Sequence, residues 1–445
     1  MTVPETLPLD LTPMSGHLPA ARPLRIALLG YRSHPFVGGQ GIYIRYLSKA
    51  LVEQGHQVDV LSGPPYPELD PRVRLIEIPS LDLFAADNHV TALRWRHLRS
   101  WSDFFEWWSM LSGGFAEPYT FCRRVVHYLR RHRDEYDLVH DNQSLGFGLL
   151  EIQRMGIPVV ATVHHPITRD LRLALEAAPN WRHRLLVRRW HSFLGMQKKV
   201  VQRLRHVVTV SEQSRGDIAA EFGRPRQAIE LIHNGIDTET FRPLDNAERH
   251  PMRIMTTASA DQPLKGLRFL LQAVADLLPR YPALELLVVG KLKEGGQTDA
   301  LLQQLGIAHR VRFVSGISTD ELVHLYNEAA VVVSPSLYEG FGLPAAEAMA
   351  CGCAVISSDG GALPEVVGDA GVVVPAGNSH ALAAALDQLL ADPVMRQTLG
   401  ARGRARILQR FCWSVCASQF DDYYRSMIKD ARSAEETFPE VACKP

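Results

Sequence analysis

The 445-residue sequence predicts an α/β protein in which two Rossmann-like domains face each other across a cleft. Short apolar segments alternate with amphipathic helical segments, which is typical of parallel sheets covered on both faces by helices. The alternation runs twice, and a polar, proline-containing segment at 235–252 separates the two runs. At roughly 150 residues per domain, the length also suits two or three domains.

The first run begins with the apolar segment 24–30, which ends in glycine and predicts a buried strand. A glycine-containing loop and a helix over 42–51 follow, and the next strand is expected at 58–61. The later strands of this half are predicted at 138–139, 159–163, 207–210 and 229–232. Because ligands of such sheets bind beyond the carboxyl ends of the strands, we expect the functional residues in the loops that follow them.

The second run repeats the pattern. Its strands are predicted at 253–258, 285–290, 311–314, 330–334, 354–357 and 371–374. Its helices are predicted at 266–278, 298–305, 319–328, 343–351 and 379–391. The resulting domain organisation is a flexible tail (1–22), an N-terminal domain (23–240), a C-terminal domain (250–408) and a helix (409–430) that packs back towards the N-terminal domain.

Composition and charge exclude several classes of protein. Lysine plus arginine and aspartate plus glutamate each number 48, and this zero net charge argues against a nucleic-acid partner. The six cysteines form no CxxC pair, so neither a disulfide scaffold nor a zinc site is indicated. Residues 1–22 hold four prolines and no apolar signal-peptide core, and no apolar run is long enough to span a bilayer. We therefore expect a cytoplasmic protein.

The strongest motif joins two acidic residues through a glycine turn, in the sequence Glu339-Gly-Phe-Gly-Leu-Pro-Ala-Ala-Glu347. An apolar strand precedes it, and a helix is expected to begin near Leu343 or Pro344. The glycines let backbone N–H groups approach a ligand closely, and the amino end of the helix favours anionic oxygens. The two carboxylates can accept hydrogen bonds from sugar or ribose hydroxyls. The alternative interpretation is a capped helix with two solvated acidic side chains.

Around this motif the sequence resembles the retaining glycosyltransferases of family 4, which have the GT-B fold. Glu339 and Glu347 match the E-x7-E pattern of that family, and the similarity is close through 339–356 and 360–367. Weaker matches extend over about residues 24 to 425. The resemblance implies transfer of a sugar from a nucleotide-diphosphate sugar to an acceptor hydroxyl, without a metal or other cofactor. The donor base, the sugar and the acceptor stay open.

The resemblance also implies roles for particular residues. His164, Lys265 and Glu339 would be catalytic, with Lys265 neutralising the leaving phosphate. The donor would be bound by Gly38, Gly39, Phe341, Gly342, Leu343 and Glu347. His165, next to His164, is a second candidate for the contact with the sugar.

One position departs from the family pattern. The family usually places an arginine and a lysine after the first strand of the second domain; Lys265 fits, but Ser259 or Ala260 stands where the arginine is expected. Losing one charge-assisted phosphate contact typically costs about 1.5–3 kcal/mol. Substitute cations are Lys291, Lys293 and Arg32. The departure keeps two alternatives open, a GT-B nucleotide-sugar epimerase and a non-catalytic relative that binds a sugar nucleotide or a lipid.

Two further segments have uncommon compositions. Residues 182–205 carry eight lysines and arginines interleaved with apolar residues and no acidic residue. This predicts either a long surface helix packed on its own sheet or contact with an anionic membrane surface, such as the inner face of the cell membrane. Residues 95–121 are rich in tryptophan and phenylalanine, which suits either a buried helical insertion or a flap over an apolar acceptor.

Overall fold

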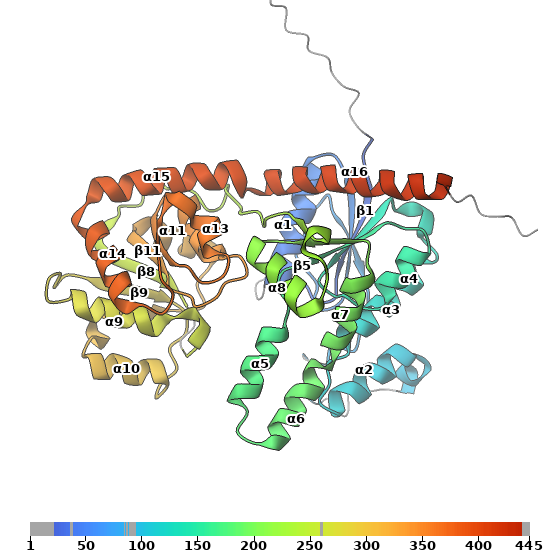
Figure 1. Cartoon of the computed structure of the whole chain (residues 1–445), viewed down its shortest axis with the longest axis horizontal. Helices are drawn as coiled ribbons and strands as arrows, with labels where there is room; N and C mark the ends of the chain where they lie inside the picture. Colours follow the sequence, from blue (N-terminus) through green and yellow to red (C-terminus); the bar gives the residue numbers. More distant parts are fainter. Residues whose placement is uncertain are drawn as a thin grey trace, which may run out of the picture.

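The computed structural model describes residues 22–35, 39–83, 85, 88, 95–258 and 261–437. It contains two parallel sheets, each forming the centre of one domain, and the two domains lie side by side (Figure 1). The predicted tail lies outside the described residues except for Arg22, whose guanidinium donates to the carboxylate of Asp137 at 2.7 Å. Gly38, Ser259 and Ala260 also lie outside the described residues.

The N-terminal sheet has seven parallel strands in the order β3-β2-β1-β4-β5-β6-β7. They are β1 (Arg25–Gly30), β2 (Gln57–Ser62), β3 (Arg74–Glu77), β4 (Leu138–Asn142), β5 (Val159–Val163), β6 (His206–Thr209) and β7 (Glu230–Leu231). The sequence did not predict β3. It is an edge strand with exposed charged ends, so it lacks the continuous apolar run of a central strand.

The C-terminal sheet has six parallel strands in the order β10-β9-β8-β11-β12-β13. They are β8 (His250–Thr257), β9 (Glu285–Val289), β10 (Val311–Val314), β11 (Ala329–Ser334), β12 (Ala354–Ser358) and β13 (Val372–Val374). Each of these overlaps a predicted strand. The linker is shorter than expected, because β8 begins at His250, within the predicted linker.

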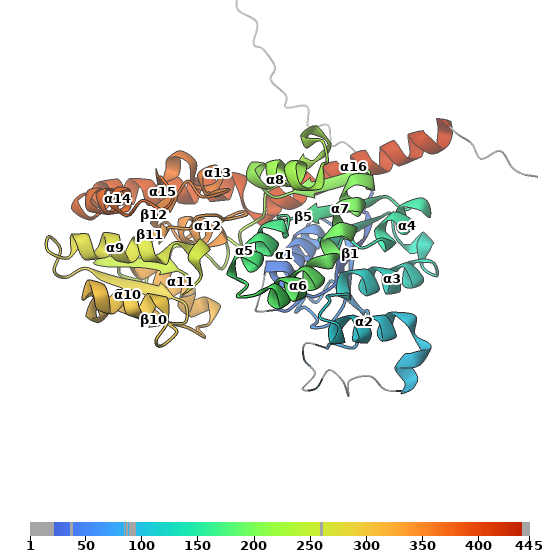
Figure 2. The same cartoon turned by 60° about the horizontal axis from the view of Figure 1, so that its bottom comes forward.

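Helices cover both faces of each sheet (Figures 1 and 2). Those of the N-terminal domain are α1 (Gly39–Glu53), α2 (Trp101–Leu111), α3 (Glu117–Leu129), α4 (Gly148–Arg154), α5 (Thr168–Ala177), α6 (Trp181–Trp190), α7 (Leu194–Arg203) and α8 (Glu212–Phe222). Those of the C-terminal domain are α9 (Leu267–Leu277), α10 (Gln297–Leu305), α11 (Thr319–Glu328), α12 (Leu343–Ala350), α13 (Leu363–Val367), α14 (Ser379–Ala391) and α15 (Pro393–Arg410). The last helix is α16 (Trp413–Thr437).

Two helical segments differ from expectation. The basic stretch is not one long helix, because a 3-10 turn at His191–Phe193 separates α6 from α7. The sequence also did not predict α15. Its start is well defined, since the Asp392 side chain accepts from the backbone N–H of Met395, but Gly400 and Gly403 lower its helix propensity. Both glycines allow α15 to pack closely: a Cβ at Gly400 would lie 2.2 Å from the carbonyl oxygen of Gly352.

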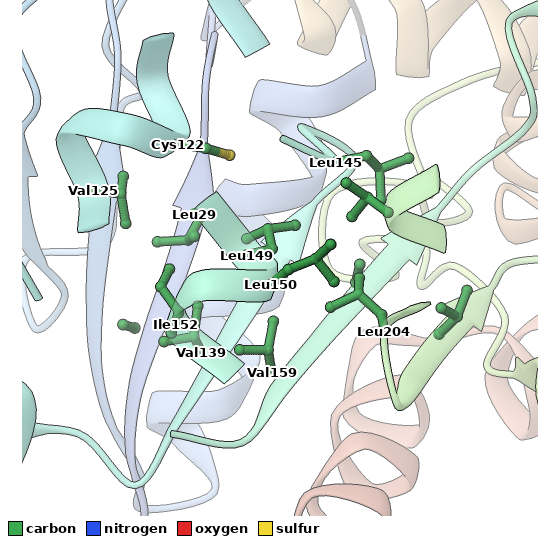
Figure 3. Close-up of a cluster of buried hydrophobic side chains, with 14 of the residues drawn as sticks. Leu29, Cys122, Val125, Val139, Leu145, Leu149, Leu150, Ile152, Val159 and Leu204 are labelled. Carbon is green, nitrogen blue, oxygen red and sulfur yellow. The ribbon is translucent and has the colours of Figure 1, made fainter. Parts of the chain in front are cut away.

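The core of the N-terminal domain lies on both faces of its sheet. On one face, aliphatic side chains from β1, β4 and β5 meet those of α3 and α4, among them Leu29, Val125, Val139 and Leu149 (Figure 3). On the other face, α16 packs on α1 and buries Phe420, Tyr424 and Met427. The C-terminal helix therefore completes the core of the N-terminal domain, as the red ribbon across the top of Figure 1 shows.

Within the described part of the chain, no helix is long and apolar enough to cross a bilayer.

Candidate active site

The site lies at the topological switch points of the two sheets. In both sheets the strand order reverses between the first strand and its neighbour, β1 beside β4 and β8 beside β11. The loops that follow such a pair of strands run in opposite directions and leave a crevice between them. Lys265 follows β8 and Glu339 follows β11, so 74 residues of sequence separate two side chains that lie in contact.

A cavity of about 1040 Å³ between the two domains collects most of the predicted site residues. Its lining includes Gly39, His164, Lys265, Glu339, Phe341, Gly342, Leu343 and Glu347. We call this cavity the interdomain cleft. Gly38, the remaining predicted donor-binding residue, lies outside the described residues.

The Glu339 carboxylate is held by two donors on one of its oxygens. Lys265 Nζ lies 2.8 Å from Glu339 Oε1, and Ser336 Oγ donates to the same oxygen at 2.7 Å. The side chain is 15% exposed. Among the described residues, none donates to Glu339 Oε2, so this oxygen is available to a hydroxyl in the cleft.

Glycines fix the backbone of this acidic residue. Gly361 has φ +70°, and a Cβ there would lie 2.2 Å from the carbonyl oxygen of Glu339. That oxygen accepts the backbone N–H of Ala362 at 2.9 Å. The close approach explains why a glycine is needed beside the first acidic residue of the motif.

Lys265 is positioned by a second tight contact. It ends the 3-10 turn Pro263–Lys265, and Gly266 follows with φ +65°. A Cβ at Gly266 would lie 2.0 Å from the carbonyl oxygen of Pro335, and Leu337 N donates to Leu264 O at 2.7 Å. The loops after β8 and β11 are thereby joined, which holds the ammonium group next to Glu339.

Glu347 lies one turn into α12 and has a different environment. Tyr326 OH donates to its Oε2 at 3.1 Å, and Tyr326 is fully buried on α11. Burial raises the pKa of Glu347 to about 7, although the Tyr326 hydrogen bond opposes this. The carboxyl therefore changes protonation near neutral pH, and only its ionised form is an acceptor on both oxygens.

The amino end of α12 opens on the same cleft. Gly342 is its N-cap, with φ +97°, and no side chain caps the helix. Uncapped N–H groups at a helix N-terminus form a ready site for phosphate oxygens. The phosphate-binding group and the two carboxylates thus come from one short segment.

His164 reaches the cleft from the end of β5 as a neutral imidazole. Its Nε2 lies 2.7 Å from Asn142 Oδ1, and Asn142 Nδ2 donates to the carbonyl oxygen of Gln40 at 3.1 Å. This arrangement makes Nε2 the protonated nitrogen and leaves Nδ1 as an acceptor. Burial, with a further contribution from His165, lowers the pKa of His164 to about 3. His165 also lines the cleft, 3.7 Å from Asp170.

The substitute cations expected from the sequence do not line the cleft. Lys291, Lys293 and Arg32 lie elsewhere; among the lysines and arginines that the structure describes, Arg45 and Lys265 line it. Arg45 is on α1, and its NH1 lies 4.0 Å from Glu68 Oε2. An available signal was its spacing from Ile42 and Tyr46, three and four residues apart on one helix face, both of which also line the cleft.

Sequence reasoning also missed an aromatic wall. The Trp413 ring stacks on Tyr46, with 5.9 Å between centroids and 18° between planes, and it meets Tyr43 edge-on. Trp413 is the first residue of α16, so no local pattern placed it here. Asn234 and Asp237, from the segment after β7, complete this side of the cleft.

Among the described residues, no group of three or more histidine, cysteine, aspartate or glutamate side chains is arranged to hold a metal ion.

Comparisons with known proteins agree with this fold and site. The family model "Glycosyltransferase Family 4" matches residues 37–240, and "Glycosyl transferases group 1" matches residues 242–406. The chain is 45% identical to the MMP α-(1→4)-mannosyltransferase of Mycolicibacterium hassiacum, over 91% of this chain and 98% of that protein. It is 29% identical to the D-inositol 3-phosphate glycosyltransferase of Streptomyces bingchenggensis, over 92% and 91% of the two chains.

A solved structure supports the same conclusion. Sucrose-phosphate synthase from Thermosynechococcus elongatus superposes with a TM-score of 0.67 and 26% identity, over 92% of this chain and 100% of that chain. The chain therefore belongs to glycosyltransferase family 4 and has the GT-B fold. It is a glycosyltransferase, and the predicted family is confirmed; the epimerase alternative is not favoured.

Proposed function

We propose that this protein is an α-(1→4)-mannosyltransferase, which transfers mannose from a nucleotide-diphosphate mannose to an acceptor hydroxyl with retention of configuration. The 45% identity to a mannosyltransferase of that linkage, over nearly the whole of both chains, supports the sugar and the linkage. The observation that carries the chemistry is the contact of Lys265 with Glu339 at 2.8 Å beside the uncapped amino end of α12.

The donor is divided among these groups by chemical type. Glu347 accepts hydrogen bonds from the ribose hydroxyls, and Glu339 Oε2 accepts one from a hydroxyl of the transferred sugar. The diphosphate lies between Lys265 and the N–H groups of α12, where positive charge and backbone donors meet. His164 Nδ1 accepts a further hydrogen bond from the sugar. This placement assigns the donor to the C-terminal domain and the acceptor to the N-terminal domain.

Transfer then proceeds on one face of the sugar. The bond from the anomeric carbon to the phosphate oxygen breaks as the acceptor oxygen attacks from the same side. The proton of the acceptor hydroxyl passes to the departing phosphate oxygen. Lys265 and the amino end of α12 stabilise the negative charge that develops there. The alternative, a side chain acting as base, is less favoured because Glu339 Oε1 is already occupied by Lys265 and Ser336.

Arg45 is our candidate for the second cation that the family usually supplies near position 259. It lines the cleft from the opposite domain, so it would reach the donor only when the domains are together. Its distance of 4.0 Å from Glu68 indicates a weak, solvent-screened pair that a phosphate can displace.

A transfer assay tests the proposal. Purified protein is given nucleotide-diphosphate mannose of each common base, with an α-mannoside acceptor, and the product is examined by NMR spectroscopy. We expect an α-(1→4)-linked mannosyl product, unchanged in rate by a metal chelator. A β-linked product, or transfer of another sugar in preference to mannose, would refute the proposal. Donor incubated without acceptor tests the epimerase alternative, which predicts a changed sugar on the nucleotide.

A thermal-shift series identifies the base of the donor. Nucleoside diphosphates are added one at a time at 100 times their dissociation constants, where a specific ligand stabilises the fold by about 2.7 kcal/mol. We expect one base to give the largest shift.

A further inference from the structure

A second cavity, of about 290 Å³, lies on the N-terminal domain and has walls that are mainly aromatic. Trp101 and Phe105 come from α2, Tyr119 from α3, Phe147 from the loop before α4, and Phe193 from the turn before α7. We call it the aromatic cavity. No residue that lines it also lines the interdomain cleft, so the two are separate sites.

The same connections nevertheless serve both cavities. The loop after β4 provides Gln143 to the cleft and Phe147 to the aromatic cavity. The segment after β5 provides His165 to the cleft and, further along, Arg189 to the aromatic cavity. Both cavities thus belong to the edge of the sheet at which the parallel strands end. A ligand that leaves the cleft along this edge meets the aromatic cavity next.

The aromatic cavity also contains a fixed cation. Arg189, on α6, donates through NH1 to Ser192 Oγ at 3.1 Å and through NH2 to Ser112 Oγ at 2.9 Å. These bonds join α6 to α2, which lie close together in both Figures 1 and 2. A guanidinium held by two hydroxyls is rigid and still has N–H donors directed at other acceptors.

The aromatic rings are arranged in advance and partly open to solvent. Trp101 stacks on Phe105 with 6.0 Å between centroids, and Phe105 meets Tyr119 edge-on at 5.5 Å. Even so, Trp101 is 56% exposed and Phe147 is 40% exposed. Large aromatic side chains left in water beside a hollow are typical of a binding site.

These features suit a carbohydrate better than a hydrocarbon chain. The C–H faces of a sugar ring pack against aromatic rings, while its hydroxyls need hydrogen-bond partners such as Arg189 and the serine hydroxyls. A hydrocarbon chain would cover the guanidinium without offering it an acceptor, which costs desolvation free energy. The cavity is also large enough for one or two sugar units rather than a whole chain.

We infer that the aromatic cavity binds a remote part of a glycan acceptor, several sugar units from the hydroxyl that receives the new sugar. This inference rests on the proposed function, because an α-(1→4)-mannosyltransferase has a glycan as its product. It makes the protein a transferase that prefers long acceptors, and it adds Trp101 and Phe147 as specificity-determining residues.

The test compares short and long acceptors. Binding of α-(1→4)-linked manno-oligosaccharides of two and eight units to the full chain is measured by calorimetry, without donor. We expect W101A and F147A to weaken binding of the eight-unit chain at least tenfold, equivalent to about 1.4 kcal/mol, and to leave the two-unit acceptor unchanged. In the transfer assay the KM for the long acceptor rises, while kcat and the KM for the donor stay constant.

Trp181→Ala is the matched control. Trp181 is 70% exposed on α6 but does not line the aromatic cavity, so W181A should bind both oligosaccharides like the wild type. If W101A and F147A bind the long chain normally, or if the wild type binds both lengths equally, the inference is wrong. The same variants are sedimented with vesicles of anionic lipid; loss of vesicle binding in W101A with unchanged glycan binding would assign the cavity to a membrane instead.

The outcomes separate this inference from the proposed function. If the wild type transfers no mannose but its long-glycan binding is lost in W101A, the cavity is a glycan site and the proposed reaction is wrong. If transfer is normal and both variants keep the wild-type KM for the long acceptor, only the cavity assignment fails.

Discussion

Glu347 is the residue whose environment most directly sets how the protein responds to pH. Burial raises its pKa to about 7, so it is largely ionised at pH 8 and largely protonated at pH 6. If the ionised form accepts the ribose hydroxyls, nucleotide affinity must fall as the pH is lowered through 7. We expect about tenfold weaker binding at pH 6 than at pH 8, measured by calorimetry.

The E347Q variant provides the control for this pH dependence. The neutral amide should bind nucleotide about tenfold more weakly at pH 8, with no dependence on pH between 6 and 8. A raised pKa also means that the carboxyl favours the folded state below its unfolded value and loses that contribution as the pH rises through 7. E347Q should therefore melt at a higher temperature than the wild type at pH 8. A pH dependence that persists in E347Q would exclude Glu347 as its source.

Lys265 is expected to act on the rate of transfer. Removing a preorganised charge from the leaving group typically lowers kcat by about 100-fold or more. K265A should show this loss with little change in the KM for the acceptor, measured by initial rates of mannosyl transfer. K291A is the matched control, since Lys291 is exposed, follows the neighbouring strand β9 and does not line the cleft. Equal losses in the two variants would contradict the role of Lys265.

At the scale of elements, the turns around α12 depend on single glycines. Gly361 combines a positive φ with a close approach to the backbone of Glu339, so any Cβ must displace that residue. We expect G361A to destabilise the fold by about 1–3 kcal/mol in urea unfolding and to abolish nucleotide binding. Gly195, exposed on α7 with nothing near its Cβ position, is the comparison: G195A should be neutral or stabilise by up to about 1 kcal/mol. Nucleotide binding retained by G361A would contradict this account of Glu339.

The elements that were predicted from the sequence share one property. Central strands such as β5 and β11 are buried along their whole length, so their apolar runs are continuous and easily read. Edge strand β3 and helix α15 were missed because charged ends in one and two glycines in the other weaken the local pattern. The break between α6 and α7 was missed because basic and apolar residues alternate across it without proline or glycine.

At the scale of the whole molecule, a small set of contacts holds the two domains together beside the cleft. Ser211 Oγ donates to the carbonyl oxygen of Gly340 at 2.8 Å, within the acidic motif itself. Tyr338 OH donates to Asp217 Oδ2 at 2.6 Å, and the guanidinium of Arg169 lies 4.0 Å from the centre of the Tyr338 ring. The N-terminal domain therefore contacts the loop that carries Glu339.

Loosening this interface should admit water to the donor. Y338F removes the hydrogen bond to Asp217 and keeps the ring, so the fold should remain as stable as the wild type. We expect hydrolysis of donor without acceptor to rise several-fold relative to transfer, because closure of the domains normally excludes water. Y281F is the control, since the Tyr281 hydroxyl bonds Asp387 at 2.6 Å within the C-terminal domain. A ratio of hydrolysis to transfer that is the same in Y338F, Y281F and the wild type would contradict a latch at Tyr338.

The sequence by itself determined the fold class, the family and the chemical types in the cleft. Strand and helix periodicity is local, and the acidic motif places Glu339 and Glu347 eight residues apart on one turn and helix. Only the tertiary structure decided what those groups experience: the contact of Lys265 with Glu339, the raised pKa of Glu347, and the neutral state of His164. It also brought Trp413 to the cleft and formed the aromatic cavity from separate helices. Burial, charge and shape at a site depend on segments far apart along the chain, and no local pattern contains them.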